Sequence, residues 1–197
     1  MVPEKKAQRV IVFNSQRMTY ADAKKAVAQI KPRVVFHCSD EGGEATNWFW
    51  GTQQFLYLKQ YSHGRFFAPS NNKVQIPLGF MTGAFQHPPW NQEVMNITKR
   101  SIPWSFVGNL KQDRFHMLEE FTLAMPQGLS KTDGSVSPQE MSAIYNSSVF
   151  VPNGRGQVSL DCFRLYEAIF AGCIPVIVST QQELKKLFPT MVNIHPF

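Results

Sequence analysis

The chain has 197 residues, of which 43% are hydrophobic and 17% charged, and its formal net charge is +6. These values suit a globular protein that buries a core without metals or disulfides. No apolar run approaches the roughly 20 residues that a membrane-spanning helix needs, and the polar start of the chain lacks the apolar stretch of a signal peptide. Cys38, Cys162 and Cys173 show no CxxC spacing, so neither a disulfide framework nor a zinc cluster is predicted.

The positive charge is concentrated in the first half of the chain. Residues 1–100 hold 13 Lys and Arg against 6 Asp and Glu, a net charge of +7, whereas residues 101–197 hold 7 against 8, a net charge of −1. The basic residues are scattered and lack the interleaved aromatic residues of a nucleic-acid surface. A solvated basic face is the favoured interpretation, and a nucleic-acid-binding α/β domain is the least favoured alternative.

The first half predicts alternating strands and helices. The expected elements are a strand at 9–13, a helix at 20–30, a strand at 33–37, a mostly helical segment at 49–61, and short strands near Phe66 and at 74–76. Pro32 supports a helix end, and Val34 and Val35 suit a strand. The pattern is typical of a βαβ arrangement.

A linker is expected near residues 83–103, where Gly, Pro, Asn and Gln are frequent and no period is visible. It divides the chain into predicted domains of residues 1–100 and 101–197. The second domain predicts strands at 104–107, 149–151 and 174–178 and helices at 112–125, 138–145, 159–171 and 181–188. The predicted fold class is therefore α/β.

The loop after the strand at 149–151 has the character of a phosphate site. It reads Pro152-Asn153-Gly154-Arg155-Gly156 and precedes a helix for which Ser159 is the expected N-cap. Glycines let a backbone approach an anion, and the start of a helix favours negative charge. The spacing matches neither GxGxxG nor the Walker pattern, so this signal alone is weak.

Arg164 and Glu167 stand three residues apart and share a face of the predicted helix. A guanidinium can pair with phosphate oxygens, and a carboxylate can accept hydrogen bonds from a ribose diol. The spacing alone favours an ordinary ion pair worth only about 0.3–0.5 kcal/mol.

Three runs resemble the signature of exostosin-like glycosyltransferases: Phe150-Val151-Pro152-Asn153-Gly154, Arg164-Leu165-Tyr166-Glu167-Ala168 and Ala171-Gly172-Cys173-Ile174-Pro175-Val176-Ile177. The resemblance implies a GT-B-like fold, in which two Rossmann-like domains face each other across a cleft. It places Arg164 at the diphosphate of the donor and Glu167 at the ribose. Ser105-Phe106-Val107-Gly108-Asn109, followed by Arg114, is similar to the opening of the family's donor domain.

The motifs and the resemblance together predict one donor site. Its members are Gly108, Asn109, Arg114, Pro152, Asn153, Gly154, Ser159, Arg164 and Glu167.

In the first half, His37-Cys38-Ser39-Asp40-Glu41 and Ile76-Pro77-Leu78-Gly79 resemble strand-end motifs of the xylosyltransferase-like branch of the family. Asp40 and Glu41 follow the carboxyl end of a predicted strand, where α/β proteins place functional groups. Either carboxylate is a candidate catalytic base toward an acceptor hydroxyl. A loop residue or a helix cap is an equally weighted interpretation of each.

The predicted function is an inverting, metal-independent transfer of a sugar from a nucleoside diphosphate sugar to a hydroxyl of a glycan, without a cofactor. The alternative is a non-catalytic remnant that binds a sugar nucleotide or a glycan. Proteins of the family usually continue beyond the point where this chain stops, so a truncated C-terminus is expected. As written, the chain predicts a cytoplasmic protein, or one of the Golgi lumen if it is a fragment of a longer secretory-pathway protein.

Overall fold

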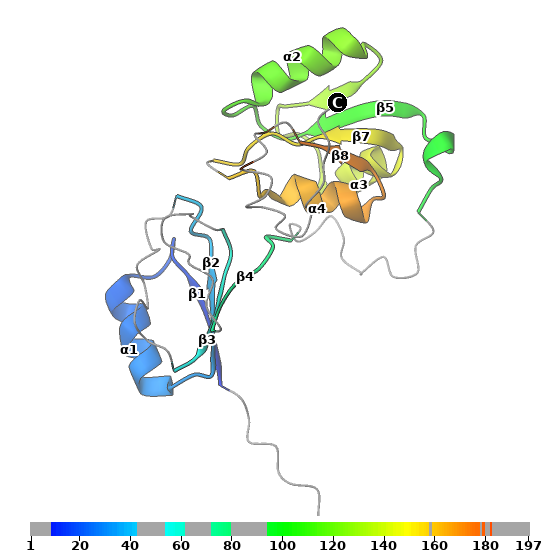
Figure 1. Ribbon diagram of the computed structural model, residues 1–197. Helices are drawn as coiled ribbons and strands as arrows, with labels where there is room; N and C mark the ends of the chain where they lie inside the picture. The colour runs from blue at the N-terminus through cyan, green and yellow to red at the C-terminus, as the bar shows by residue number, and fades with distance from the viewer. Residues whose placement is uncertain are drawn as a thin grey trace, which may run out of the picture. The chain divides into compact units, whose positions relative to one another are not determined.

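The computed structural model describes residues 9–42, 54–61, 72–79, 94–157, 159–177, 179 and 182. These residues form an α/β protein with two parallel four-stranded sheets, an arrangement compatible with a Rossmann-like fold (Figure 1). The chain divides into two compact units, Met1–Pro77 and Leu78–Phe197. This division lies before the linker expected near residues 83–103, of which residues 83–93 lie outside the described part.

The strands of the first unit follow one another across its sheet in chain order, and each pairs in parallel with the next. They are β1 (Val10–Asn14), β2 (Val34–Cys38), β3 (Leu56–Lys59) and β4 (Lys73–Gln75).

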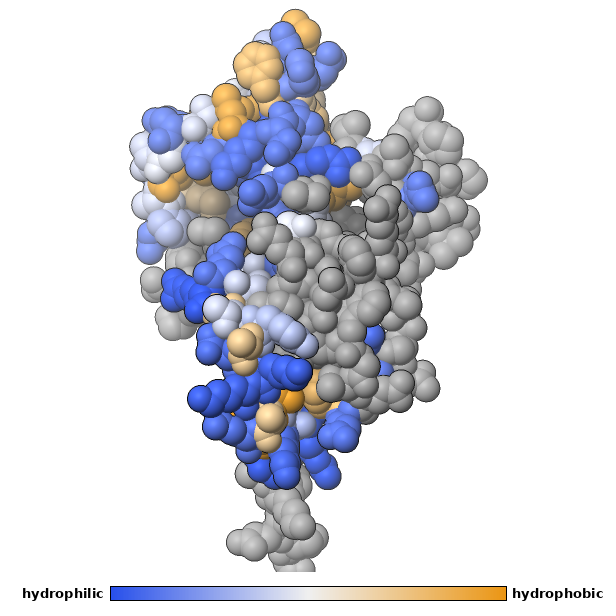
Figure 2. Space-filling view, turned by 90° about the vertical axis from the view of Figure 1, so that its left-hand side faces the viewer, coloured by the Kyte–Doolittle hydropathy of each residue, from blue (hydrophilic) through white to orange (hydrophobic). Residues whose placement is uncertain are grey.

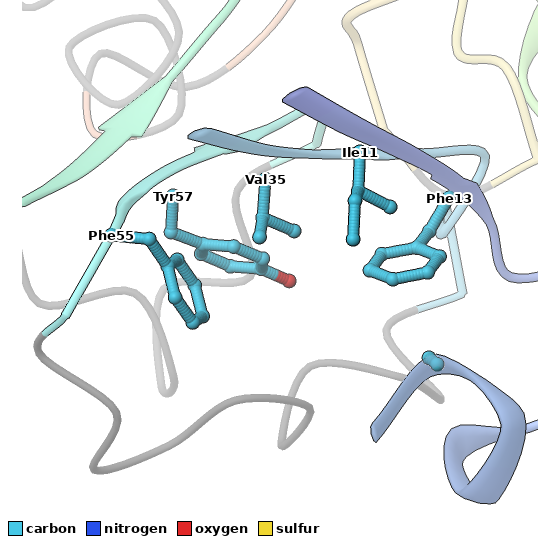
Figure 3. Packing of buried hydrophobic residues seen from close by; sticks show 6 residues of the cluster. Ile11, Phe13, Val35, Phe55 and Tyr57 are labelled. Carbon is cyan, nitrogen blue, oxygen red and sulfur yellow. The ribbon is translucent and has the colours of Figure 1, made fainter. Parts of the chain in front are cut away.

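Alternate residues of these strands build the core of the first unit. Ile11 and Phe13 of β1, Val35 of β2 and Tyr57 of β3 are buried and point to the same side of the sheet (Figure 3). Ala23 of the following helix packs against them. The period of two in the sequence thus places one face of the sheet against a helix.

The helix α1 (Tyr20–Ile30) has the predicted bounds. The Thr19 hydroxyl accepts a hydrogen bond from the backbone N–H of Asp22 and donates one to the Asp22 carboxylate. This cap satisfies a donor that the first helical turn leaves without a helical partner. At the other end Lys31 is left-handed, with φ of 47°, and Pro32 follows, which cannot continue the helix.

One predicted helix is wrong. Residues 49–61 were expected to be mostly helical, but Leu56–Lys59 forms β3, which pairs with β2 on one side and β4 on the other. Phe55 and Tyr57 are buried in the core, so pairing and burial outweigh the local pattern. Residues 49–53 and the strand expected near Phe66 lie outside the described residues.

The second unit has the sheet order β6-β5-β7-β8, again with every pair parallel. The predicted order of strand, helix and strand over residues 149–178 is confirmed, and the two strands pair in parallel. The helix expected at 181–188 falls almost entirely outside the described residues. The observed elements are η1 (Ile97–Lys99), β5 (Ile102–Val107), α2 (Arg114–Ala124), β6 (Leu129–Lys131), α3 (Pro138–Asn146), β7 (Ser148–Pro152), α4 (Phe163–Phe170) and β8 (Ile174–Val176).

Helices cover both faces of this sheet, with α2 on one side and α3 and α4 on the other (Figure 1). Trp104 and Phe106 of β5 pack with Leu118 of α2. Val151 of β7 packs with Ala168 of α4 in a separate cluster. Because both faces are covered, the central strands β5 and β7 are largely apolar on both sides, whereas the edge strand β6 (Leu129–Lys131) is mostly exposed.

Arg100 connects several elements at the end of the same sheet where the strands begin. Its guanidinium donates to the backbone carbonyls of Tyr145, Ser148 and Ala171 at 3.3, 2.6 and 2.8 Å. These carbonyls lie at the end of α3, the start of β7 and the end of α4. One buried cation therefore links the ends of α3 and α4 to the start of β7.

On the face shown in Figure 2, the described residues are mostly hydrophilic, with scattered hydrophobic side chains. Phe115 and Leu123 of α2 are exposed, and single exposed apolar residues of this kind are normal. None of the helices in the described part has the length and apolar character that a membrane crossing requires.

Substituting Gly128 by alanine should destabilise the second unit. An added Cβ would lie 1.8 Å from Cε2 of Trp104, whose buried indole N–H donates to the Met125 carbonyl at 2.7 Å. Overpacking of this kind lowers the free energy of unfolding by about 1–3 kcal/mol. Gln127→Ala, at an exposed neighbour, should change it by less than about 0.5 kcal/mol. Thermal unfolding of both variants is the measurement, and equal stability of the two would contradict this packing.

Candidate functional site

The strand order of the second unit points to one place for a ligand. The chain passes from β5 to β6 on one side and then returns to β7 on the other side of β5. The loops that follow β5 and β7 therefore diverge at the carboxyl ends of two adjacent strands, which is where open α/β sheets bind ligands. Among its described strands, the first unit shows no such reversal of order.

The loop after β5 turns tightly over a buried arginine. Gly108 has φ of +139°, and a Cβ there would lie 2.2 Å from Nη2 of Arg164. The Gly108 N–H donates to the Lys131 carbonyl of β6 at 3.0 Å. Only glycine leaves room for the guanidinium beneath this turn.

Arg164 is the second residue of α4 and reaches across to β5. Its Nε and Nη2 donate to the Val107 carbonyl at 3.1 and 3.0 Å. Its guanidinium carbon lies 4.3 Å from the centre of the Phe106 ring, a favourable cation–π distance. Arg164 thus fixes the start of α4 to the end of β5.

Glu167 is buried one turn further along α4. Burial raises the pKa of Tyr145, Arg164 opposes this shift and Glu167 adds to it. The charges of Arg164 and Glu167 therefore both influence the pKa of the buried Tyr145. The ion pair that spacing alone favours is not formed between these two described residues.

The loop after β7 is held by its own backbone and by a buried amide. Asn153 donates its N–H to the Val176 carbonyl at 2.8 Å, and its Oδ1 accepts a hydrogen bond from the Cys162 thiol at 2.9 Å. Pro152 before it is buried as well. Asn153 therefore stabilises the loop after β7 through buried hydrogen bonds.

Arg114 joins the two loops. Its Nη1 donates to the Asn109 carbonyl at 2.8 Å and its Nε to the Arg155 carbonyl at 2.7 Å. A Cβ on Gly154 would lie 2.8 Å from Cγ of Arg114, so the loop packs directly against the start of α2. The structure thus brings Gly108, Asn109, Arg114, Gly154 and Arg164 together at one sheet edge.

Ser159 does not have its predicted role. The helix expected from residue 159 begins at Phe163, and its N-cap is Cys162, which makes no side-chain cap hydrogen bond. The Ser159 hydroxyl instead accepts from the N–H of Asp161 at 3.0 Å. Asp161 is buried and accepts a hydrogen bond from the Tyr166 hydroxyl at 2.6 Å, which holds this segment out of the helix.

Two residues of this edge were missed in the sequence. Asp113 Oδ1 accepts from the backbone N–H of Arg155 at 3.0 Å, and its Oδ2 lies 3.4 Å from Nε of Arg155. The partners are 42 residues apart in the chain, so spacing offers no sign of the pair. For Arg155, its position between two glycines of the loop could have marked it as a candidate site residue.

In the first unit, the predicted carboxylates lie at the carboxyl end of β2. Asp40 is buried and accepts a hydrogen bond from Nζ of the buried Lys59 at 2.6 Å. Glu41 follows and is half-buried. Their assignment as a catalytic base stays a prediction, although the charge of Asp40 already has a partner. Lys59 was missed because its segment was expected to be helical.

A buried histidine completes this polar cluster. Nδ1 of His37 and the Tyr57 hydroxyl share a hydrogen bond at 2.5 Å, and His37 is the register neighbour of Lys59. Burial, with a further contribution from Lys59 and an opposing one from Asp40, lowers the pKa of His37 to about 4. Burial also lowers the pKa of Lys59, against the opposing effect of Asp40.

Comparison of the sequence with protein-family models and with curated proteins finds no match. Within the described ranges, no group of three or more His, Cys, Asp or Glu side chains is arranged to hold a metal ion.

The neutral state of His37 should make the first unit sensitive to acid. Its pKa is about 4 in the folded chain against 6.5 as the reference value, so the unfolded chain binds a proton that the folded chain does not. His37 should therefore leave the free energy of unfolding unchanged above pH 6.5 and should lower it as the pH decreases toward 4, by up to about 3 kcal/mol. Urea unfolding between pH 7.5 and 4.5, followed by hydrogen exchange in β2, measures this effect.

His37→Asn is the control, since asparagine keeps a polar group near Tyr57 and takes up no proton. Its stability should depend less on pH over this range. An unchanged dependence would assign the acid sensitivity to other groups.

Proposed function

We propose that the chain is a glycosyltransferase that takes a sugar from a nucleoside diphosphate sugar and transfers it to a hydroxyl of a glycan. The observation that carries the proposal is the meeting of two glycine-bearing loops with buried arginines at the carboxyl edge between β5 and β7. A strand-order reversal, a close backbone approach and fixed positive charge are what a diphosphate site on an α/β sheet needs. The resemblance of the segments around Arg164 to exostosin-like enzymes supports the same ligand.

The GT-B arrangement, with two Rossmann-like domains facing across a cleft, is part of this proposal. Its support is that each unit has its own parallel sheet. Positive charge at the donor site stabilises the departing diphosphate, so the transfer proceeds without a metal. Glu41 is the preferred candidate base, because Asp40 is buried and bound to Lys59.

A second candidate is a protein that binds the donor without transferring its sugar. The Asp40–Lys59 ion pair favours it, because the pair engages one of the two predicted carboxylates and leaves only Glu41 as a candidate to accept a proton from an acceptor hydroxyl. A donor screen with UDP, GDP and their sugars, followed by radiolabelled transfer to glycan acceptors, separates the two. Binding without product supports the second candidate, and absence of binding removes both.

Gly108→Ala should weaken nucleoside diphosphate binding by tenfold or more. The added Cβ would displace the Arg164 guanidinium beneath the turn, and the backbone φ of +139° disfavours any side chain. Isothermal titration calorimetry with UDP and GDP is the measurement.

Gly172→Ala is the matched control. Gly172 also has positive φ, at +68°, and its added Cβ would lie 2.1 Å from Cγ1 of Val94, but it precedes β8 at the opposite edge of the sheet. Both variants should lose stability, by about 1–3 kcal/mol, while the folded Gly172→Ala protein should keep the parent's affinity. Equal affinity losses would show that the carboxyl edge is not the binding site.

A further inference from the structure

The chain holds two Asn-x-Ser/Thr triplets, and both lie in the second unit. They are Asn96-Ile97-Thr98 and Asn146-Ser147-Ser148. Such a triplet is the acceptor sequence for an N-linked glycan, for which the transferring enzyme needs the asparagine amide together with the hydroxyl two residues later. A folded chain can be modified only where the amide and that hydroxyl are both accessible. The structure therefore distinguishes the two triplets.

In the first triplet, both groups are exposed. Asn96 is the N-cap of η1, and its side chain and that of Thr98 lie at the surface. Oδ1 of Asn96 accepts from the Thr98 N–H at 3.1 Å and from the Thr98 hydroxyl at 3.0 Å. Because a backbone N–H can only donate, the accepting atom of the amide is its oxygen. The amide nitrogen, Nδ2, donates to none of the residues that the structure describes.

A glycan on Nδ2 of Asn96 preserves this local structure. A glycosylated asparagine is still an amide, so its Oδ1 can accept hydrogen bonds as before. Both hydrogen bonds from Thr98, and with them the cap of η1, are therefore compatible with the modification. The neighbouring Met95 carbonyl accepts from Nε of the buried Arg100 at 3.1 Å. This contact fixes the first triplet to the end of the sheet where the strands begin.

The second triplet is inaccessible at its hydroxyl. Asn146 is the last residue of α3, and Ser148 is the first residue of β7. Ser148 is 0% exposed. Its hydroxyl donates to the Ile144 carbonyl at 2.6 Å and lies 2.7 Å from the Ser105 hydroxyl. An enzyme could reach this hydroxyl only by opening the junction of α3 and β7, so the folded chain offers Asn96 and withholds Asn146.

We propose that Asn96 is the acceptor of an N-linked glycan in a compartment that supplies a lipid-linked oligosaccharide diphosphate. Nδ2 of Asn96 forms a bond to the anomeric carbon of the first sugar, and the bond from that carbon to the diphosphate oxygen breaks. The diphosphate leaves with the electron pair, and the transferring enzyme takes up the proton that Nδ2 releases. This inference is independent of the proposed function, because the triplet lies at the opposite end of the sheet from the candidate site.

The test incubates the folded 197-residue chain with purified oligosaccharyltransferase and its lipid-linked oligosaccharide. Two synthetic peptides, with the sequences of residues 92–102 and 142–152, carry the same triplets without the fold. We expect both peptides to be glycosylated and the folded chain to gain one glycan, at Asn96. Enzymatic release of the glycan converts the modified asparagine to aspartate, which identifies the site by mass spectrometry.

Four variants of the folded chain test the assignment to Asn96. Asn96→Gln and Thr98→Ala should abolish the modification, whereas Thr98→Ser should retain it because the hydroxyl remains. Asn146→Gln is the matched control and should be modified as the parent is. Circular dichroism of each variant shows whether the fold is intact, as expected for the two positions that are exposed.

Three outcomes would overturn the proposal. If the folded chain is not modified while the peptide of residues 92–102 is, the fold conceals Asn96. If that peptide is not modified while the peptide of residues 142–152 is, the first triplet is not an acceptor sequence. If the folded chain carries its glycan at Asn146, burial of the Ser148 hydroxyl does not protect the second triplet.

Discussion

The candidate site depends on the contact between the Arg164 guanidinium and the Val107 carbonyl. A parallel strand that ends in a loop leaves its last carbonyl without a ladder partner, and burial makes such an acceptor costly. Arg164 supplies two donors from the first turn of α4. This contact requires a turn that accommodates only glycine at position 108. The start of α4 and the turn after β5 are thus held together by one cation beneath one turn.

The first unit also buries a cation, but a carboxylate rather than a backbone carbonyl compensates for its charge. The apolar face of its sheet becomes polar toward the carboxyl end, where His37 and Lys59 are register neighbours. Burying an ammonium is unfavourable unless a partner compensates for the lost hydration, and Asp40 provides that partner. Removing either charge would leave the other buried alone, so Asp40 is fixed to β3 just beyond the end of β2. This constraint ties Asp40 to the interior and leaves its neighbour Glu41 closer to solvent.

Local signals in the sequence predict most elements of the fold. α1 has the predicted bounds because Thr19 and Pro32 mark its two ends, and several strands are displaced by only one or two residues. β3 and β6 escape prediction because they are short and owe their strand conformation to neighbours distant in the chain. The same distinction between local signals and distant partners applies to the residues of the candidate site. Gly108 and Arg164 lie within recognisable motifs, whereas the pairs Asp113–Arg155 and Asp40–Lys59 join segments whose proximity only the fold determines. Ser159 is predicted as an N-cap because serine is a good N-cap residue, whereas α4 begins four residues later and the buried Asp161 is bound to the Tyr166 hydroxyl.

The anchoring of Arg155 at both its N–H and its carbonyl also bears on how this loop can vary in length. Pro152 to Arg155 spans a fixed distance between the end of β7 and the first turn of α2, so an added residue there would move the guanidinium out of register with both loops. After Gly156 the chain closes a local turn, in which the Gly156 N–H donates to the Ser159 carbonyl at 2.8 Å. Insertions and deletions are therefore disfavoured between Pro152 and Arg155, and we expect related chains of different length to diverge elsewhere in the loop.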